Sequence, residues 1–230
     1  MLYARPHGDV KLQLSAHGGY VLNQSVRERL LAHAEKPDDL RIVAFAGIIA
    51  VLWRDEAANP VPILGLNSQT FKRLASRCFG AAGEALAASV APGASHPARD
   101  RLREFNDILR LLLEHRAALS EETQWLACAI ATACLGENHL WQDLGLPSRS
   151  ALSRLLVEHF GPLASKNVAG MRWKKFFYKQ LCLRADINIC KAPSCSECVD
   201  YDLCFGPEDA ACPSTSTLAV GISGWCAAPG

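Results

Sequence analysis

SEETQWLACAIATACLG (residues 120–136) is the stretch that decides the fold class. Ser120 stands where an N-cap accepts from the first free backbone amides, and the two glutamates that follow suit the positive end of a helix dipole. Gly136 falls where a helix C-cap is expected. We therefore expect an apolar helix here, with Cys128 and Cys134 as core residues.

Similar signals on both sides of this stretch predict further helices. Asn67 and Ser148 are expected N-caps, and glycines and prolines mark the stops. One strand-like stretch, residues 61–64, is short and contains a proline. The expected helices cover residues 25–34, 40–53, 68–79, 98–115, 121–135, 139–144, 149–160 and 166–184. The sequence thus predicts an all-α protein with a helical bundle-like body.

Composition divides the chain into four expected regions. A partly ordered N-terminal extension covers residues 1–39, and the α-helical domain covers residues 40–186. A cysteine-rich, cluster-binding loop follows at residues 187–206. Residues 207–230 are rich in Gly, Pro, Ser and Thr, which predicts a flexible, disordered tail.

Charge and hydropathy narrow the class of protein. The formal net charge of +1 gives the chain as a whole no polyanion-binding character. We do not expect residues 1–10 to act as a signal peptide. The most apolar stretch, residues 42–53, is well short of the roughly 20 residues that span a bilayer. We expect a cytoplasmic protein that does not enter a membrane.

The run CKAPSCSECVDYDLC contains four of the ten cysteines, at Cys190, Cys195, Cys198 and Cys204. Four thiols brought together must either oxidise or bind a cation, because close thiolates repel one another. Clustered cysteines in a cytoplasmic protein are more often metal ligands or redox groups than disulfides. Soft thiolates select zinc, copper(I) or iron–sulfur clusters. We interpret this run as a metal or cluster site.

The cysteine spacing favours an iron–sulfur cluster over zinc. Structural zinc sites usually join two separated cysteine pairs, whereas this run holds one C-x2-C between two single cysteines. Its opening C-x4-C-x2-C matches the plant-type ferredoxin spacing, although the fourth cysteine is much nearer here. A zinc knuckle, a redox-active C-x2-C and a reduced loop without a ligand remain as alternatives.

The helix that leads into this loop predicts two different faces. Its apolar face consists of Trp173, Phe176, Phe177 and Leu181. Its basic row consists of Arg172, Lys175 and Lys179, and Cys182 continues that row. The row either attracts an oxyanion and offsets the charge of a sulfide cluster, or it is a solvated face. In the first case Cys182 is a possible extra ligand, and in the second it is a small half-buried side chain.

Residues 141–156 read as helix, glycine turn and helix, which is also the layout of a DNA-binding helix-turn-helix. Arg149 and Arg154 are then expected to point outward, but this layout is common in ordinary all-α proteins.

The histidines near helix ends have structural roles more often than ligand roles; these are His115, His139 and His159. The common catalytic motifs are absent from the sequence, and we do not expect an enzyme.

Two blocks together resemble the NifQ family of nitrogen-fixation proteins. MRWKKFFYKQLC (residues 171–182), followed by the four-cysteine run and CFG (residues 204–206), is similar to the C-terminal signature of that family. ACLGENHLWQDLGLPSRSALSRLL (residues 133–156) resembles its central region. The similarity extends over about residues 40–207, and the cysteine spacing joined to the preceding helix is its specific part.

This resemblance implies a non-catalytic, cytoplasmic carrier that supplies molybdenum for the nitrogenase iron–molybdenum cofactor. The implied ligands are Cys190, Cys195, Cys198 and Cys204, which hold an iron–sulfur cluster of the 3Fe–4S or 4Fe–4S type that can include molybdenum. The implied partners are the cofactor scaffold protein, the nitrogenase reductase and molybdate or another molybdenum donor. We expect a monomer without a nucleic-acid or membrane partner.

Two rival functions remain open at this point. One is a DNA-binding regulator that carries an iron–sulfur cluster and uses Arg149 and Arg154 on its recognition helix. The other is a zinc-stabilised interaction module. Elemental analysis for iron, molybdenum, zinc and sulfide distinguishes these possibilities.

Overall fold

The computed structural model describes residues 23–53, 59–91, 99–186 and 194–208. Within these ranges the regular structure is helical, apart from an isolated β-bridge between Asn59 and Val90, which confirms the all-α prediction. No helix in the described ranges is long and apolar enough to cross a membrane. The elements are α1 (Gln24–Ala32), α2 (Leu40–Leu52), α3 (Ser68–Ala88), α4 (Arg99–Glu114), α5 (Glu121–Cys134), α6 (Leu140–Asp143), α7 (Arg149–Ala164), α8 (Trp173–Arg184), the 3-10 turn η1 (Cys195–Glu197) and α9 (Tyr201–Phe205).

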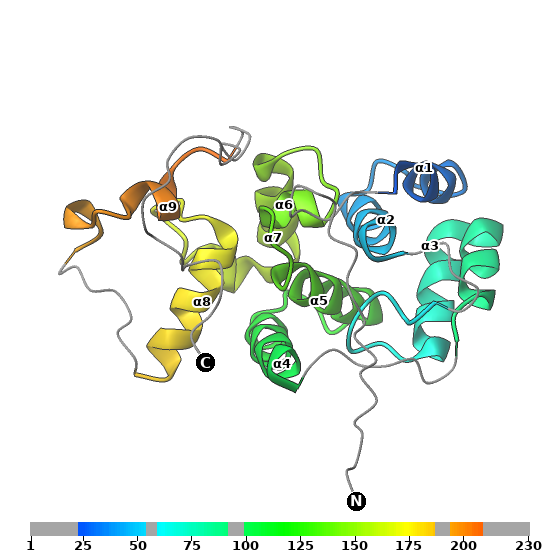
Figure 1. The fold of residues 1–230 in the computed structure, drawn as a ribbon, viewed down its shortest axis with the longest axis horizontal. Helices are drawn as coiled ribbons and strands as arrows, with labels where there is room; N and C mark the ends of the chain where they lie inside the picture. Colours follow the sequence, from blue (N-terminus) through cyan, green and yellow to red (C-terminus); the bar gives the residue numbers. More distant parts are fainter. Residues whose placement is uncertain (1–22, 54–58, 92–98, 187–193, 209–230) are drawn as a thin grey trace, which may run out of the picture.

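Helix α5 lies in the middle of the helical body and packs against α2, α4 and α6 (Figure 1). It is buried around its whole circumference, with Trp125, Leu126 and Ile130 at most 1% exposed. The buried hydroxyl of Thr132 is satisfied, because it accepts from the Leu64 amide at 3.1 Å and donates to a carbonyl of its own helix. A helix that is apolar all round is stable only at the centre of such a body.

The predicted N-caps are confirmed. The side chain of Asn67 accepts from the Thr70 amide at 2.8 Å, and Ser120 and Ser148 each accept from the amide three residues ahead. These bonds satisfy backbone donors that have no partner within the helix. Helices α3, α5 and α7 therefore begin where the sequence predicts.

The region predicted as a partly ordered N-terminal extension contributes helix α1 to the core. Val26 and Leu30 of α1 are buried, and α1 packs against α2 and α3. Two glycines allow α2 to approach the turn before α7. A Cβ on Gly47 would lie 2.1 Å from the Leu144 carbonyl oxygen, and Gly145 in that turn has φ +61°.

Two predicted helix ends coincide with breaks in the helical geometry, after which a second helical stretch follows directly. The predicted helix 68–79 continues as α3 to residue 88 through a kink at Gly80 (φ 49°, ψ −134°). The predicted helix 149–160 continues as α7 to residue 164, with non-helical angles at Phe160. Pro162 explains that kink, because its ring lacks an N–H donor and clashes with the carbonyl of the preceding turn.

Helix α8 begins at Trp173, seven residues later than the predicted start at residue 166. The intervening chain turns at Gly170 (φ +67°), where the Asn167 side chain accepts from the Met171 amide and donates to its carbonyl, both at 2.8 Å. The predicted apolar face is confirmed, since Trp173, Phe176 and Phe177 are all at most 6% exposed.

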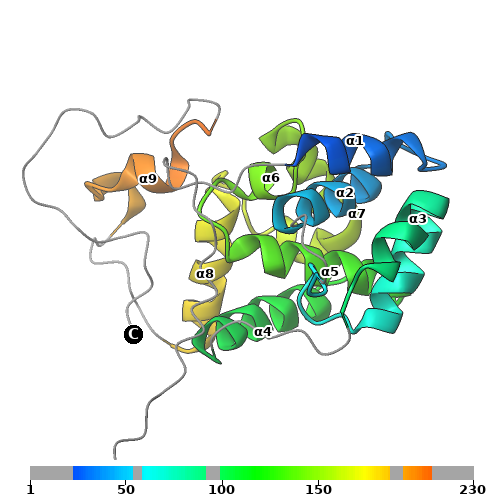
Figure 2. The ribbon, with the colours of Figure 1, turned by 45° about the vertical axis from the view of Figure 1, so that its right-hand side comes forward.

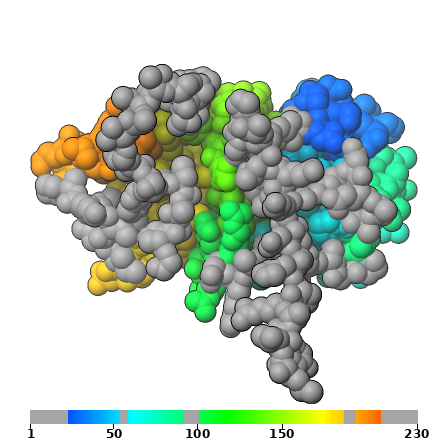
Figure 3. All heavy atoms as spheres, viewed as in Figure 1, coloured from blue at the N-terminus to red at the C-terminus, as the bar shows by residue number. Residues whose placement is uncertain are grey.

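The C-terminal segment, residues 194–208, lies beside α8 at the end of the molecule opposite α3 (Figures 1 and 2). It contains η1 and α9, and it reaches the surface at that end (Figure 3). Three of its apolar side chains are strongly exposed: Val199 by 99%, Leu203 by 54% and Tyr201 by 45%. The segment therefore lacks a core of its own and depends on contacts with the body.

Candidate metal centre

Three of the four predicted ligands lie on the C-terminal segment. Cys195 opens η1, Cys198 directly follows it, and Cys204 lies in α9. All three are partly exposed, and none of the described cysteines forms a disulfide. Cys190 lies outside the described residues. The chemistry of this donor set, soft thiols open to solvent, fits a thiolate-bound iron–sulfur cluster.

In the described ranges, no three His, Cys, Asp or Glu side chains lie close enough together to hold a metal ion. Convergence of the four thiols therefore stays a prediction. The local backbone is compact: the Cys198 amide donates to the Cys195 carbonyl at 3.2 Å, and the Tyr201 amide donates to the Cys198 carbonyl at 3.1 Å.

Arg172 fastens the C-terminal segment to the start of α8. Its backbone amide donates to the Cys204 carbonyl at 2.7 Å. Its guanidinium donates to the carbonyls of Leu203, Gly206 and Pro207 at 3.4, 3.3 and 3.2 Å. The sequence predicts Arg172 in a basic row that either offsets the charge of a cluster or is solvated, whereas in the structure its guanidinium holds backbone carbonyls around Cys204.

Glu208 provides a second attachment. Its side chain is 3% exposed and lies 3.6 Å from Arg149 Nε and 3.9 Å from His139 Nδ1. Burial lowers the pKa of His139, and the charge of Glu208 partly opposes that change. The predicted tail begins at residue 207, whereas the described chain continues in contact with the body through Glu208. No sequence signal separates this glutamate from an ordinary tail residue.

Lys179 is the residue of the basic row that approaches a candidate ligand. Its Nζ lies 4.0 Å from Cys195 Sγ, toward which it donates. Opposite unit charges about 4 Å apart interact by about 4 kcal/mol at an effective dielectric constant of about 20. Lys175, one turn earlier, is exposed to solvent. Cys182 is half-buried in the last turn of α8, and its role as a ligand stays a prediction.

A buried ion pair that the sequence pattern does not predict anchors α8. Lys174 Nζ lies 2.6 Å from Asp143 Oδ2 and donates to the Gly136 carbonyl at 2.7 Å, while the Asn138 amide donates to Asp143 at 2.9 Å. Asp143 is 1% exposed. In the sequence Lys174 looks no different from its exposed neighbour Lys175, so the pair becomes visible only once α6 and α8 are packed.

The cysteines of the body have a different environment from those of the segment. Burial raises the pKa of Cys78 and Cys134 to about 12 and that of Cys128 to about 11. These thiols stay protonated at neutral pH and are poor ligands. The prediction that Cys128 and Cys134 are core residues is confirmed.

The histidines at helix ends make structural contacts. His115 Nδ1 bonds the Leu111 carbonyl at 2.9 Å, and its Nε2 lies 2.9 Å from Lys166 Nζ. Burial lowers the pKa of His159, which favours its neutral form. The contacts of His115 with Leu111 and Lys166 agree with the predicted structural role.

The expected helix-turn-helix exists as α6, a turn and α7, but part of its outward face is engaged within the protein. The Arg149 guanidinium donates to the carbonyls of Gly170 and Met171. The Ser153 hydroxyl accepts from Trp173 Nε1 at 3.1 Å. These contacts engage Arg149 and Ser153 within the protein, whereas Arg154 is exposed as predicted.

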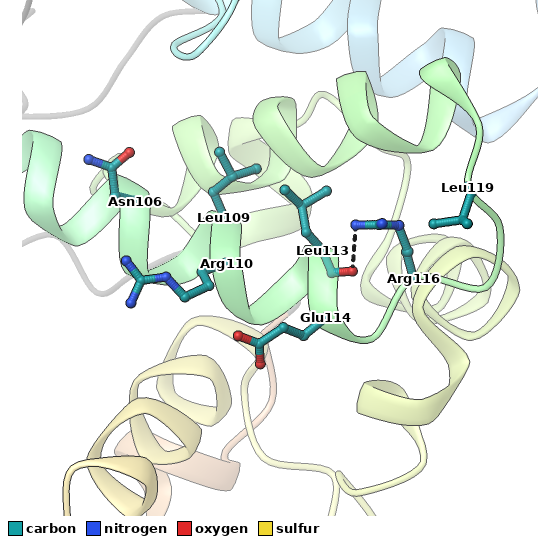
Figure 4. A pocket seen from close by; sticks show the side chains of 7 residues that line it. All are labelled: Asn106, Leu109, Arg110, Leu113, Glu114, Arg116 and Leu119. Carbon is teal, nitrogen blue, oxygen red and sulfur yellow. Dashed lines mark hydrogen bonds between the residues drawn. The ribbon is translucent and has the colours of Figure 1, made fainter.

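A depression of about 700 Å³ lies along α4 and the turn that follows it (Figure 4). Arg116 closes one end of it, where its guanidinium donates to the Leu113 carbonyl at 2.9 Å. Its lining residues are Asn106, Leu109, Arg110, Leu113, Glu114, Arg116 and Leu119. The lining has no thiol or imidazole, so it offers no soft metal ligands.

Fold and site together define an all-α protein whose thiol-bearing C-terminal segment is fastened to a basic helix. The family model described as NifQ matches residues 44–206, which covers most of the chain and includes α8, Cys195, Cys198 and Cys204. The chain belongs to the NifQ family.

Curated relatives agree with this assignment. The chain is 42% identical to Protein NifQ of Azotobacter vinelandii over 152 residues, which cover 63% of this chain and 78% of that protein. It is 39% identical to Protein NifQ of Rhodobacter capsulatus over 138 residues, covering 56% and 77%. It is 44% identical to Protein NifQ of Klebsiella pneumoniae over 112 residues, covering 42% and 67%. No solved structure matches the chain significantly.

Proposed function

We propose that this protein is a non-catalytic carrier that binds an iron–sulfur cluster able to include molybdenum and supplies molybdenum for nitrogenase cofactor assembly. The observation that carries the proposal is the NifQ family match, which spans both α8 and the cysteine segment. Family membership supports a role in nitrogen fixation and molybdenum processing. The nitrogenase reductase and the cofactor scaffold protein are the proposed partners.

The proposed ligands are Cys190, Cys195, Cys198 and Cys204. When bound, the cluster supplies sulfide-bridged iron to which molybdenum can be attached. The protein contributes thiolates on a short segment whose last part is fixed by Arg172. The segment is short and has no hydrophobic core of its own. We therefore expect bonds between the thiolates and the cluster to order it further.

The position of the segment suits a carrier. It lies at one end of the molecule, and its thiols are partly exposed rather than enclosed in the core (Figure 3). A cargo held there can reach another protein without unfolding of the helical body. The exposed side chains of Val199 and Leu203 lie next to the proposed ligands and are available to a partner.

The DNA-binding alternative has less support than the carrier function, because Arg149 and Ser153 bond other parts of the same chain. The zinc-stabilised module uses the same thiols, and the metal content distinguishes it from the carrier. A colourless protein with one zinc per chain would favour the zinc module.

Anaerobic purification with analysis of iron, sulfide, molybdenum and zinc tests the proposal. We expect iron, sulfide and a visible charge-transfer absorption in the unmodified protein. Alanine at Cys190, Cys195, Cys198 or Cys204 should abolish that absorption and the molybdenum content, while the core variant Cys128→Ala should retain both. Metal content equal to that of the unmodified protein in the four ligand variants contradicts the assignment.

A further inference from the structure

Lys179 is placed on a rigid part of α8. The neighbouring Tyr178 hydroxyl donates to Glu104 of α4, and Arg184 at the end of α8 pairs with Glu114 at 2.6 Å. These contacts fix the helix on both sides of Lys179 against α4. The packed body thus places the backbone of Lys179, and its Nζ lies 4.0 Å from Cys195 Sγ of the C-terminal segment.

The charge of Lys179 is directed at the thiol rather than at a carboxylate. In the described part of the chain, the ion pairs of α8 involve Lys174 with Asp143 and Arg184 with Glu114, and none involves Lys179. Both Lys179 and Cys195 are partly buried, so solvent screens their interaction less than that of a fully exposed pair.

Lys175 provides an internal comparison. It has the same side chain on the same helix one turn earlier, but it is exposed. In the described ranges it makes no ion pair and no side-chain hydrogen bond. The difference between the two lysines is their position relative to the cysteine segment.

We infer that Lys179 is a positioning residue for the cluster, whose ammonium donates to the sulfur of Cys195 and offsets its negative charge in the loaded protein. This inference rests on the proposed function. Hydrogen bonds to the ligand sulfurs and the local charge set the reduction potential of an iron–sulfur centre. A positive charge beside a ligand sulfur favours the reduced, more negative cluster. Lys179 therefore raises the reduction potential of the cluster.

The experiment compares three variants, K179M, K179R and K175M, after anaerobic reconstitution with ferrous iron and sulfide. Circular dichroism verifies the helical fold, iron and sulfide analysis gives the loading, and a redox titration followed by electron paramagnetic resonance gives the midpoint potential. We expect K175M to match the unmodified protein. K179M should show a more negative midpoint potential than the unmodified protein, or should lose the cluster while remaining folded. K179R, which keeps the positive charge, should retain the cluster loading and the midpoint potential of the unmodified protein.

Two outcomes overturn the inference. One is a K179M protein with the loading and potential of K175M. The other is a K179R protein as impaired as K179M, which indicates a requirement for side-chain shape rather than charge. The proposed function fails separately, if the unmodified protein takes up no cluster or if the cysteine variants keep one.

Discussion

The thiols of the helical body and those of the C-terminal segment show one side chain in two environments. Cys78, Cys128 and Cys134 are at most 6% exposed, and burial raises the pKa of each. Cys195 and Cys204 are partly exposed on a segment with little apolar area to bury. The position in the fold, rather than residue type, thus separates packing thiols from candidate ligands.

The two regions also differ in how they are held. The body is stabilised by apolar contacts around α5 and by the buried pair of Lys174 and Asp143. The segment is held by hydrogen bonds from Arg172 and by the burial of Glu208. Breaking a segment contact should therefore act locally, whereas breaking a body contact should lower the stability of the whole fold.

Thiol reactivity gives the largest expected contrast. A rise in pKa from 9.0 to about 12 lowers the thiolate fraction of Cys78 and Cys134 by about 1000-fold relative to an ordinary thiol. In metal-free, reduced protein at pH 8, iodoacetamide should modify Cys195, Cys198 and Cys204 far faster than these two. Mass spectrometry of the individual peptides measures the rates. Equal modification rates for the buried and the exposed cysteines in the native protein, without denaturant, would contradict this difference between the two regions.

The buried ion pair gives the next largest effect. Asp143→Asn removes the charge that compensates Lys174, which should lower the free energy of unfolding by about 3–5 kcal/mol. Chemical denaturation followed by circular dichroism measures the change. Arg184→Gln breaks a more exposed pair with Glu114 and should cost at most about 1 kcal/mol. A similar decrease in the free energy of unfolding in both variants would show that burial does not distinguish the two ion pairs.

Removal of the Arg172 side chain gives a smaller and local effect. Its hydrogen bonds to three carbonyls involve a charged donor. Arg172→Ala should therefore weaken the attachment of the C-terminal segment to the helical body by about 1.5–3 kcal/mol. Amide hydrogen exchange in α9 should then rise by roughly 10- to 100-fold, with exchange in α5 unchanged. Lys175→Ala, an exposed change on the same helix, serves as the control. An equal rise in α5 would mean that the segment and the body open together.

Much of the fold could be predicted because the signals that carry it are local. Capping by Asn67, Ser120 and Ser148 depends on bonds within four residues, and the apolar character of α5 is visible in a single stretch. The predicted ends near Gly80 and Pro162 coincide with kinks at Gly80 and Phe160, and packing lets helical structure resume beyond each local break. The late start of α8 depends on the turn at Gly170, whose signal is one glycine in a polar stretch.

The sequence by itself determined the all-α class, the main helices and the spacing of the cysteines, because these follow from periodicity, capping and residue chemistry over short distances. Only the tertiary structure decided which charges act where. Arg172 holds the segment, Lys174 is buried against Asp143, Lys175 faces solvent and Lys179 approaches Cys195. These four basic residues, one just before α8 and three within it, look alike in the sequence until neighbouring elements define which of them are desolvated and paired.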